Sequence, residues 1–346
     1  MIVGGGLHAL SIVRALADRH GITDVAVVDA HGVLSEGAPP LLRLKDAVPA
    51  YLDMYPKALR EWRRIAGLRR RRAGGHVLLA HGEDSAAAYR FQAHLAGAVG
   101  SRSVPLDRDD LRRLCPGLSL FDGTRLAVRE GTYFRDAALL PMESILRRMA
   151  GSAVRRGCHL LAGVTPIRLR TVAGRVSGIE TSHGVIHAER VLLNGPAIAM
   201  GMTAAVGLPL HLDWVDRIKT LPFAPWLMPS VASEALGVEI WQDAEGAVTI
   251  MGAAAAAQAV ALFPALAAAA VAQRRRVPRE RTPDGLPIVG PCDPDGLLVN
   301  AAWGDATVWA APVAAAMLAD ALAGDAAALP PAFSSRRFGA GCRTAA

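Results

Sequence analysis

Glycines clustered at the start of the chain have the spacing that lets a backbone cradle a phosphate. The segment Met1-Ile-Val-Gly-Gly-Gly-Leu-His-Ala9 contains the pattern Gly-x-Gly-x-x-Ala. Gly4 would permit a tight turn from strand to helix, Gly6 would let the backbone approach a pyrophosphate, and Ala9 would let the helix pack closely on its strand. Residues 10–18 are predicted to continue this helix, whose positive end would face the phosphates. The predicted dinucleotide loop consists of Gly4, Gly5, Gly6, Leu7, His8 and Ala9.

An acidic residue follows the loop at the distance that ribose recognition requires. The segment Asp24-Val-Ala-Val-Val-Asp29 reads as a short buried strand that ends in a carboxylate. We expect Asp29, with Ala30 after it, to contact the ribose of the dinucleotide. An ordinary glycine-rich turn of an α/β domain is the alternative, but strand, loop, helix, strand and acid in this order favour the dinucleotide site.

Charge and cysteine usage narrow the class of protein. The chain has 346 residues and a net charge of +7, with arginine runs at 69–72 and 274–276. No aromatic stacking platform accompanies these runs, so nucleic-acid binding is not predicted, and a solvated face or a docking surface for an acidic partner fits better. The four cysteines form no Cys-x-x-Cys pair, so neither a disulfide framework nor a metal site is predicted.

Location is predicted from two further features of the chain. No signal peptide precedes the glycine loop, which together with the cysteine usage predicts a cytoplasmic protein. Residues 251–272 are alanine-rich and uncharged, but we expect them to form a buried or amphipathic helix rather than a membrane span.

The remaining elements must position the dinucleotide. A first βα unit at the N-terminus and a last one, with a strand at 296–302 and a helix at 310–323, are expected to lie side by side in one sheet. Ligands of such sheets bind at the carboxyl ends of the strands. Further helices are predicted at 46–65, 107–116 and 135–156, and further strands at 75–81, 159–170, 175–181 and 185–195.

Motifs along nearly the whole chain resemble D-amino-acid-oxidase-like flavoproteins, and more narrowly the β subunits of heterotetrameric sarcosine oxidases. They are the segments 2–10, 133–137, 282–288, 300–304 and 333–338. The resemblance implies an α/β fold with a Rossmann-like FAD-binding domain and a second, α+β substrate domain built on a mixed or antiparallel sheet. It assigns residues 1–72, 135–205 and 281–346 to the FAD-binding domain and residues 73–134 and 206–280 to the substrate domain.

The resemblance also implies an activity. In this family an amino acid or a secondary amine is oxidised to an imine by hydride transfer to FAD. We expect the chain to do this as one subunit of a heteromeric oxidase or dehydrogenase, with a small amino-acid substrate. The alternative is a non-catalytic subunit of the same fold that scaffolds or regulates an active partner.

Individual residues take roles from the resemblance. The backbone of Val164 would contact the adenine, and Asn194 and Gly195 would pack on the cofactor. Arg43 would grip the substrate carboxylate, the task that a guanidinium fork suits, unless it is a solvent-facing arginine. The loop near the flavin ring would consist of Trp303, Gly304, Asp305, Ala306 and Thr307.

The chain departs from the family pattern on the flavin side. Arg135 stands where the β subunits carry the histidine that attaches FMN, so covalent FMN is not expected, while noncovalent FMN at a subunit interface is left open. Two glycines of the family's last loop become Ala306 and Thr307, its lysine becomes Trp309, and Asp305 adds a negative charge. The residues expected to bind the adenosine half of FAD thus match the family pattern better than those expected near the flavin and the substrate. Candidate residues of the substrate cavity are His211, Asp213, Trp241 and Trp309.

Overall fold

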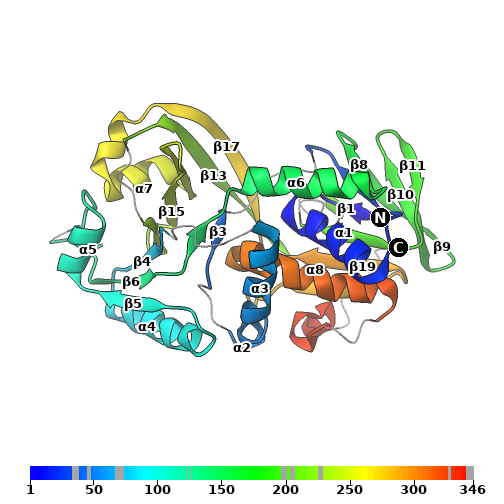
Figure 1. Ribbon diagram of the computed structural model, residues 1–346, viewed down its shortest axis with the longest axis horizontal. Helices are drawn as coiled ribbons and strands as arrows, with labels where there is room; N and C mark the ends of the chain where they lie inside the picture. The colour runs from blue at the N-terminus through cyan, green and yellow to red at the C-terminus, as the bar shows by residue number, and fades with distance from the viewer. Residues whose placement is uncertain are drawn as a thin grey trace.

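The protein consists of two lobes, each built on its own large β-sheet (Figure 1). The computed structural model describes residues 1–32, 39–44, 48–66, 74–121, 123–124, 126–195, 201–202, 207–224, 229–325 and 329–339. The arginine run 69–72 and Cys342 lie outside these residues.

The first lobe is organised by a six-stranded sheet with the order β18-β19-β12-β1-β2-β8. Its strands are β1 (Ile2–Val3), β2 (Ala26–Asp29), β8 (His159–Ala162), β12 (Val191–Asn194), β18 (Ile288–Cys292) and β19 (Leu297–Ala301). All neighbours are parallel except β18 and β19. The first and last βα units therefore share one sheet, but β12 lies between β1 and β19, so the prediction that they are direct neighbours was wrong.

Helices and a small sheet cover the two faces of this six-stranded sheet. On one face lie α1 (Gly6–His20), α6 (Met142–Arg155) and α8 (Thr307–Ala323), with α3 (Tyr55–Ala66) packed on α8. On the other lies an antiparallel sheet of β9 (Pro166–Val172), β10 (Arg175–Thr181) and β11 (Gly184–His187). Strands such as β12, with four buried residues, are apolar because both faces are covered.

The second lobe contains an eight-stranded sheet with the order β17-β13-β16-β15-β14-β4-β6-β5. Its strands are β4 (His76–Ala80), β5 (Ser103–Leu106), β6 (Glu130–Phe134), β13 (His211–Pro222), β14 (Ser230–Ser233), β15 (Val238–Gln242), β16 (Ala247–Gly252) and β17 (Val271–Arg281). Only the pair β14–β4 is parallel.

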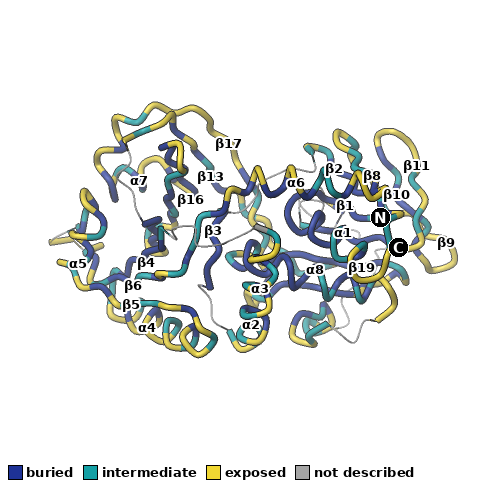
Figure 2. The backbone as a smooth tube through the Cα atoms, in the orientation of Figure 1, coloured by how far each residue is buried: buried dark blue, intermediate teal, exposed yellow. Residues whose placement is uncertain are grey.

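Helices cover this sheet unevenly. The helices α5 (Arg108–Leu114) and α7 (Ala255–Leu262) pack on one face, and α4 (Glu83–Ala98) packs on the other face near β4 and β6. The rest of that second face carries an apolar cluster that packs against Leu139 of the first lobe. Leu139 belongs to a two-stranded sheet of β3 (Leu41–Leu42) and β7 (Ala138–Leu139). The edge strand β17 is largely exposed (Figure 2).

Four predicted elements differ from those observed. The strand predicted at 159–170 is divided between β8 and β9, which belong to different sheets. The helix predicted at 46–65 consists of two helices, α2 (Pro49–Leu52) and α3, separated at Asp53 and Met54. The helix predicted at 135–156 begins only at Met142, because the backbone before it bonds to other segments, with Leu140 N donating to Pro40 O at 2.8 Å. The strand predicted at 185–195 is divided between β11 and β12.

The apolar stretch 251–272 also differs from the expectation of one long helix. It contains the end of β16, the eight-residue helix α7, a 3₁₀ turn at Pro264–Ala268 and the start of β17. The segment Gly304–Ala323 is the one among the described residues that is long and apolar enough to cross a membrane, and 61% of its apolar window is buried in the protein. Since α8 packs against α1 and α3, we interpret it as a core helix of the first lobe.

Candidate functional site

The glycine loop lies between β1 and α1 and is buried throughout. Residues 4–9 are all buried, and α1 begins at Gly6. Gly4 and Gly6 have φ angles of 97° and 85°, a backbone conformation that residues other than glycine rarely adopt. Gly4 N donates to Val28 O at 2.9 Å, which fixes the loop against the end of β2. The sequence therefore uses glycine here because the turn requires it.

The N-terminus of α1 has the properties of an anion site. Its N-cap is Gly5, and among the described residues no side chain caps this end of the helix. The first N–H groups of a helix have no partner inside the helix and need an acceptor when they are buried. A phosphate supplies such acceptors, and the helix dipole favours its charge. The cradle therefore fits the pyrophosphate of a dinucleotide.

Asp29 shapes the same cradle. Its buried carboxylate accepts Gly5 N at 2.7 Å through Oδ2 and the N–H groups of His31 and Gly32 at 2.8 and 2.7 Å through Oδ1. A carboxylate has about four acceptor positions, so Oδ2 retains capacity for a ribose hydroxyl. Val164 N donates to Asp29 O at 3.3 Å, which places Val164 beside the carboxyl end of β2. The structure thus brings Asp29 and Val164 together, and Ala30 follows directly.

Two asparagines at the carboxyl ends of β12 and β19 hold the glycine loop through hydrogen bonds. Asn194 Nδ2 lies 3.1 Å from Gly4 O and 3.3 Å from Gly5 O, and its Oδ1 accepts Asn300 Nδ2 at 2.7 Å. Asn300 Oδ1 accepts Trp303 Nε1 at 2.6 Å. Both asparagines are buried, and buried amides need such complete pairing. Asn194 therefore holds the loop.

His8 extends this network from α1 to α8. Its Nε2 lies 2.9 Å from Thr307 O and its Nδ1 lies 3.2 Å from Asn300 Nδ2. Because a carbonyl only accepts and an amide nitrogen only donates, Nε2 carries the proton and the imidazole is neutral. Burial lowers the pKa of His8 to about 4, against the opposing effect of the bond to Thr307. The ring stacks on Trp303 at a centroid distance of 5.6 Å, so His8 joins the two loops.

The loop between β19 and α8 follows directly on this network. Ala302 has a φ of 60°, a left-handed conformation that costs a residue with a Cβ roughly 1–2 kcal/mol. Gly304 and Ala306 form a 3₁₀ turn, and α8 begins at Thr307. Asp305 forms an ion pair with Arg279 of β17 at 3.4 Å. The negative charge that Asp305 adds to this loop is therefore partly balanced by a cation from the second lobe.

Glu280, near the end of β17, was not predicted as a site residue. Its Oε2 accepts Ala302 N at 2.9 Å, so it contacts the loop that the family places near the flavin. Burial raises the pKa of Glu280 to about 7, and the hydrogen bond from Ala302 opposes this shift only partly. A carboxyl group that titrates near neutral pH thus lies at the junction of the two lobes.

Replacing Glu280 with glutamine is expected to change how stability depends on pH. The folded protein keeps this proton up to about pH 7, whereas the unfolded chain releases it near the ordinary value of 4.5. Raising the pH through this window therefore destabilises the parent protein but not Glu280→Gln, which should be more stable by about 1–3 kcal/mol at pH 8. Urea unfolding at pH 5 and pH 8 measures the difference, and Glu143→Gln, an exposed matched variant, should show none. If the unfolding free energies of Glu280→Gln and the parent differed equally at both pH values, the raised pKa of Glu280 would be contradicted.

Arg43 lies in a buried ion pair between the lobes. Its side chain is 3% exposed, and its Nη2 donates to Glu239 of β15 at 2.8 Å. Its Nη1 contacts His76 Nε2, and His76 Nδ1 lies 2.9 Å from Ser230 Oγ. The alternative of a solvent-facing arginine is therefore wrong. The role of Arg43 in holding a substrate carboxylate stays a prediction, in which a substrate would share this guanidinium with Glu239.

The other candidates for the substrate cavity have different positions. Trp241 is buried on the face of β15 that looks toward the first lobe, in a cluster with Val215, Met251 and Val277. His211 is exposed at the start of β13, whereas Asp213 nearby is half-buried and pairs with Arg281. Of these three candidates, only Trp241 lies in the apolar cluster between the lobes.

Trp309 was wrongly predicted to line the substrate cavity. Its side chain is 1% exposed and packs edge-on against Tyr51 and Tyr55, at centroid distances of 5.1 and 5.5 Å. Trp62 of α3 also bonds to α8, since its Nε1 donates to Val308 O at 3.0 Å. Trp309 therefore stabilises the packing of α8 on α3 and takes no part in a carboxylate clamp.

Gly195 and Arg135 lie apart from one another. Gly195 N donates to Asn300 O at 3.0 Å, which keeps Gly195 at the carboxyl end of β12 beside the glycine loop. Arg135 is exposed directly after β6 in the second lobe, where its N–H donates to Arg102 O at 2.8 Å.

The sequence analysis missed Asn300, Glu239 and Glu280 as site residues. The strand that contains Asn300 was predicted, and a polar residue near its carboxyl end was a usable signal.

Comparisons with known proteins agree with this geometry. A family model described as FAD dependent oxidoreductase matches residues 1–213, more than half of the chain. Sarcosine oxidase subunit beta of an Arthrobacter species is 27% identical, over 99% of this chain and 91% of its own. The protein of the same name from Rhizobium meliloti is 24% identical, over 88% of this chain and 79% of its own.

A solved structure shows the same fold. The L-proline dehydrogenase of P. horikoshii superposes with a TM-score of 0.80 at 16% identity, over 97% of this chain and 96% of its own. The two proteins therefore share the same overall fold. With its glycine cradle and the family match together, the chain belongs to the DAO family of FAD-dependent oxidoreductases.

Proposed function

We propose that the protein oxidises an amino acid or a secondary amine to an imine, as the flavin-bearing subunit of a heteromeric oxidase or dehydrogenase. The observation that carries this proposal is the similarity to sarcosine oxidase subunit beta along 99% of the chain. The buried, uncapped N-terminus of α1 and the ordered support of its loop favour a subunit that still holds its cofactor.

Bound FAD would supply the two-electron acceptor, and the chain's own residues would bind and orient the substrate. Arg43, the predicted ligand of the substrate carboxylate, is buried, and Glu239 holds its guanidinium in place. The apolar wall of Trp241, Met251 and Val277 would exclude water from the substrate. Such residues position the amine, while the electron chemistry belongs to the cofactor.

The surface of β13 and β17 supports a heteromeric assembly. Trp214 and Val271 are large apolar residues that are 46% and 59% exposed on these neighbouring strands. Arg274 on the same strand pair is bonded to Asp216 at 2.6 Å and is itself 62% exposed. Exposed aromatic and arginine side chains are typical of protein interfaces. We infer that this edge of the eight-stranded sheet faces a partner subunit.

The test is anaerobic reduction of the flavin by candidate substrates. The chain is purified alone and together with proteins encoded beside it, and the flavin spectrum is recorded with sarcosine, proline and other N-alkyl or cyclic amino acids. Bleaching by at least one of them, followed by detection of the imine or its hydrolysis product, is the expected result. A complex that retains FAD and bleaches with none of the panel would overturn the catalytic proposal.

The same preparation tests the proposal on FMN. With Arg135 at the attachment position, acid precipitation should release all flavin into the supernatant. Any FMN found in the complex but absent from the isolated chain would then be noncovalent and would depend on the subunit interface. Flavin that stays with the precipitated chain would contradict this.

A non-catalytic subunit that scaffolds an active partner is the second candidate. It is favoured by two observations: Arg43 is already paired with Glu239, and Trp309, at the family's lysine position, is buried in the core. If this candidate holds, removing the chain should abolish assembly of the complex, whereas Trp241→Ala should leave the activity of the complex unchanged.

A further inference from the structure

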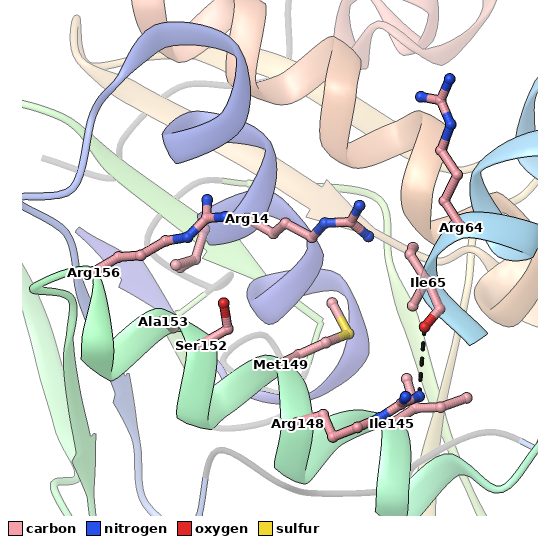
Figure 3. A pocket seen from close by; sticks show the side chains of 10 residues that line it. Arg14, Arg64, Ile65, Ile145, Arg148, Met149, Ser152, Ala153 and Arg156 are labelled. Carbon is pink, nitrogen blue, oxygen red and sulfur yellow. Dashed lines mark hydrogen bonds between the residues drawn. The ribbon is translucent and has the colours of Figure 1, made fainter. Parts of the chain in front are cut away.

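A small pocket lies on the helical face of the first lobe, between α1, α3 and α6 (Figure 3). Its volume is about 190 Å³, and its floor is apolar, with Val13, Ile145 and Met149 contributing. Arginines from all three helices surround it: Arg14, Arg64, Arg148 and Arg156. Figure 3 shows the Arg64 side chain extending away from the others, so Arg14, Arg148 and Arg156 are the cations available to a ligand. Cations beside an apolar floor are the composition of a site for an amphipathic anion.

The pocket carries net positive charge after its ion pairs are counted. Asp18 is shared by Arg14, at 3.2 Å, and by Arg156. Glu61 pairs with Arg64 at 3.1 Å. The four guanidinium groups therefore face two carboxylates and leave two positive charges unbalanced.

Arg148 is the member of the group most available to a ligand. Its Nη2 lies 3.4 Å from Ile65 O, a long hydrogen bond to a neutral acceptor at the rim of the pocket (Figure 3). A guanidinium prefers the paired oxygens of a phosphate or a carboxylate to a single carbonyl, since two charged hydrogen bonds replace one neutral bond. A ligand anion could displace this contact at little cost.

The pocket is separate from the pyrophosphate cradle. Arg14 follows Gly6 by eight residues along α1, about 12 Å at the rise of an α-helix. The cradle lies at the N-terminal end of that helix, while the pocket lies against its side, where α6 crosses it. An anion bound here would be a second ligand rather than part of FAD.

We propose that this pocket binds a small phosphate monoester, with its phosphate among Arg14, Arg148 and Arg156 and its organic group on the apolar floor. A phosphate monoester carries about −1.5 to −2 charges at neutral pH, which matches the two unbalanced positive charges better than a monocarboxylate does. The volume of about 190 Å³ admits one compact ring or short chain beside the phosphate but no dinucleotide.

The experiment measures binding to the full chain saturated with FAD, so that the pyrophosphate cradle is already occupied. Phenyl phosphate, inorganic phosphate and benzoate are titrated separately by calorimetry. Phenyl phosphate should bind at one site per chain, with inorganic phosphate weaker because it lacks the apolar group and benzoate weaker because it has one charge. In Arg148→Gln the affinity for phenyl phosphate should fall at least about tenfold.

Arg147→Gln is the matched control. It removes the same charge from the adjacent position of α6, where Arg147 is exposed and bonded to Glu143 outside the pocket. Its affinity for phenyl phosphate should stay that of the parent. Both arginines are exposed at the surface of α6, so both variants should keep the parent's unfolding temperature.

Three results of the binding experiment would overturn the proposal. They are the absence of saturable binding by phenyl phosphate, an equal loss of affinity in Arg147→Gln, which would indicate general electrostatic attraction, and binding of benzoate as tight as that of phenyl phosphate. A crystal structure with phenyl phosphate lying elsewhere would do the same. Contact of this pocket with an acidic side chain of a partner subunit, with no free phosphate bound, would assign it to an interface instead.

Discussion

Gly6→Val is expected to yield a folded chain that is purified without FAD, with an affinity for added FAD at least about 100-fold below that of the parent. Gly6 begins α1, is buried, and has a φ of 85°. A β-branched residue disfavours this conformation and adds side-chain atoms where the backbone must approach the pyrophosphate. The flavin absorbance of the purified protein and titration of the apoprotein with FAD measure the effect.

Gly157→Ala is the matched control for backbone strain. Gly157 has a φ of 96°, and its Cβ would meet nothing within 4 Å. The substitution should therefore lower the unfolding free energy by about 1–2 kcal/mol and leave FAD binding unchanged. If Gly6→Val retained FAD with the parent's affinity, the glycine loop would not be the cradle.

Arg43→Met is expected to destabilise the protein by about 3–5 kcal/mol, because it breaks a buried ion pair with the Glu239 carboxylate. Methionine has a similar length and no charge, so the loss reports on the ion pair more than on a cavity. Chemical unfolding of the FAD-bound protein, with tertiary structure followed by tryptophan fluorescence, measures the change.

The double variant Arg43→Met/Glu239→Gln separates charge from function. Removing both charges of a buried pair is often nearly neutral, so the double variant should recover most of the stability lost in Arg43→Met. If Arg43 also holds the substrate carboxylate, KM for an amino acid should stay high in the double variant despite its recovered fold. Recovery of both stability and KM would restrict Arg43 to a structural role.

Local patterns predicted the dinucleotide side of the site. Gly4, Gly6 and Asp29 lie within one βαβ unit, where a tight turn, a helix end and a strand end follow each other in the chain. Each residue type answers a local requirement, namely a positive φ for the glycines and an acceptor at the strand end for the acid. Such requirements are visible in a single sequence.

Long-range packing decided what the sequence could not reveal. The position of Trp309 depends on Tyr51 and Tyr55, which lie far away in the chain, whereas its place at the family's lysine position suggested a cavity residue. Glu280 gains its raised pKa only because β17 delivers it against Ala302 of the other lobe. Neither contact leaves a periodic or compositional trace.

The chain order of the cradle's supports has a consequence for synthesis. The glycine loop is synthesised well before Asn194 and Asn300, which hold it. His8 likewise has its partner at Thr307, 299 residues further along the chain. Domains generally fold as units during synthesis, but this one is closed by its last strand and helix. The nascent chain therefore cannot complete its FAD cradle until α8 has been synthesised, and a chain truncated before α8 should emerge without cofactor.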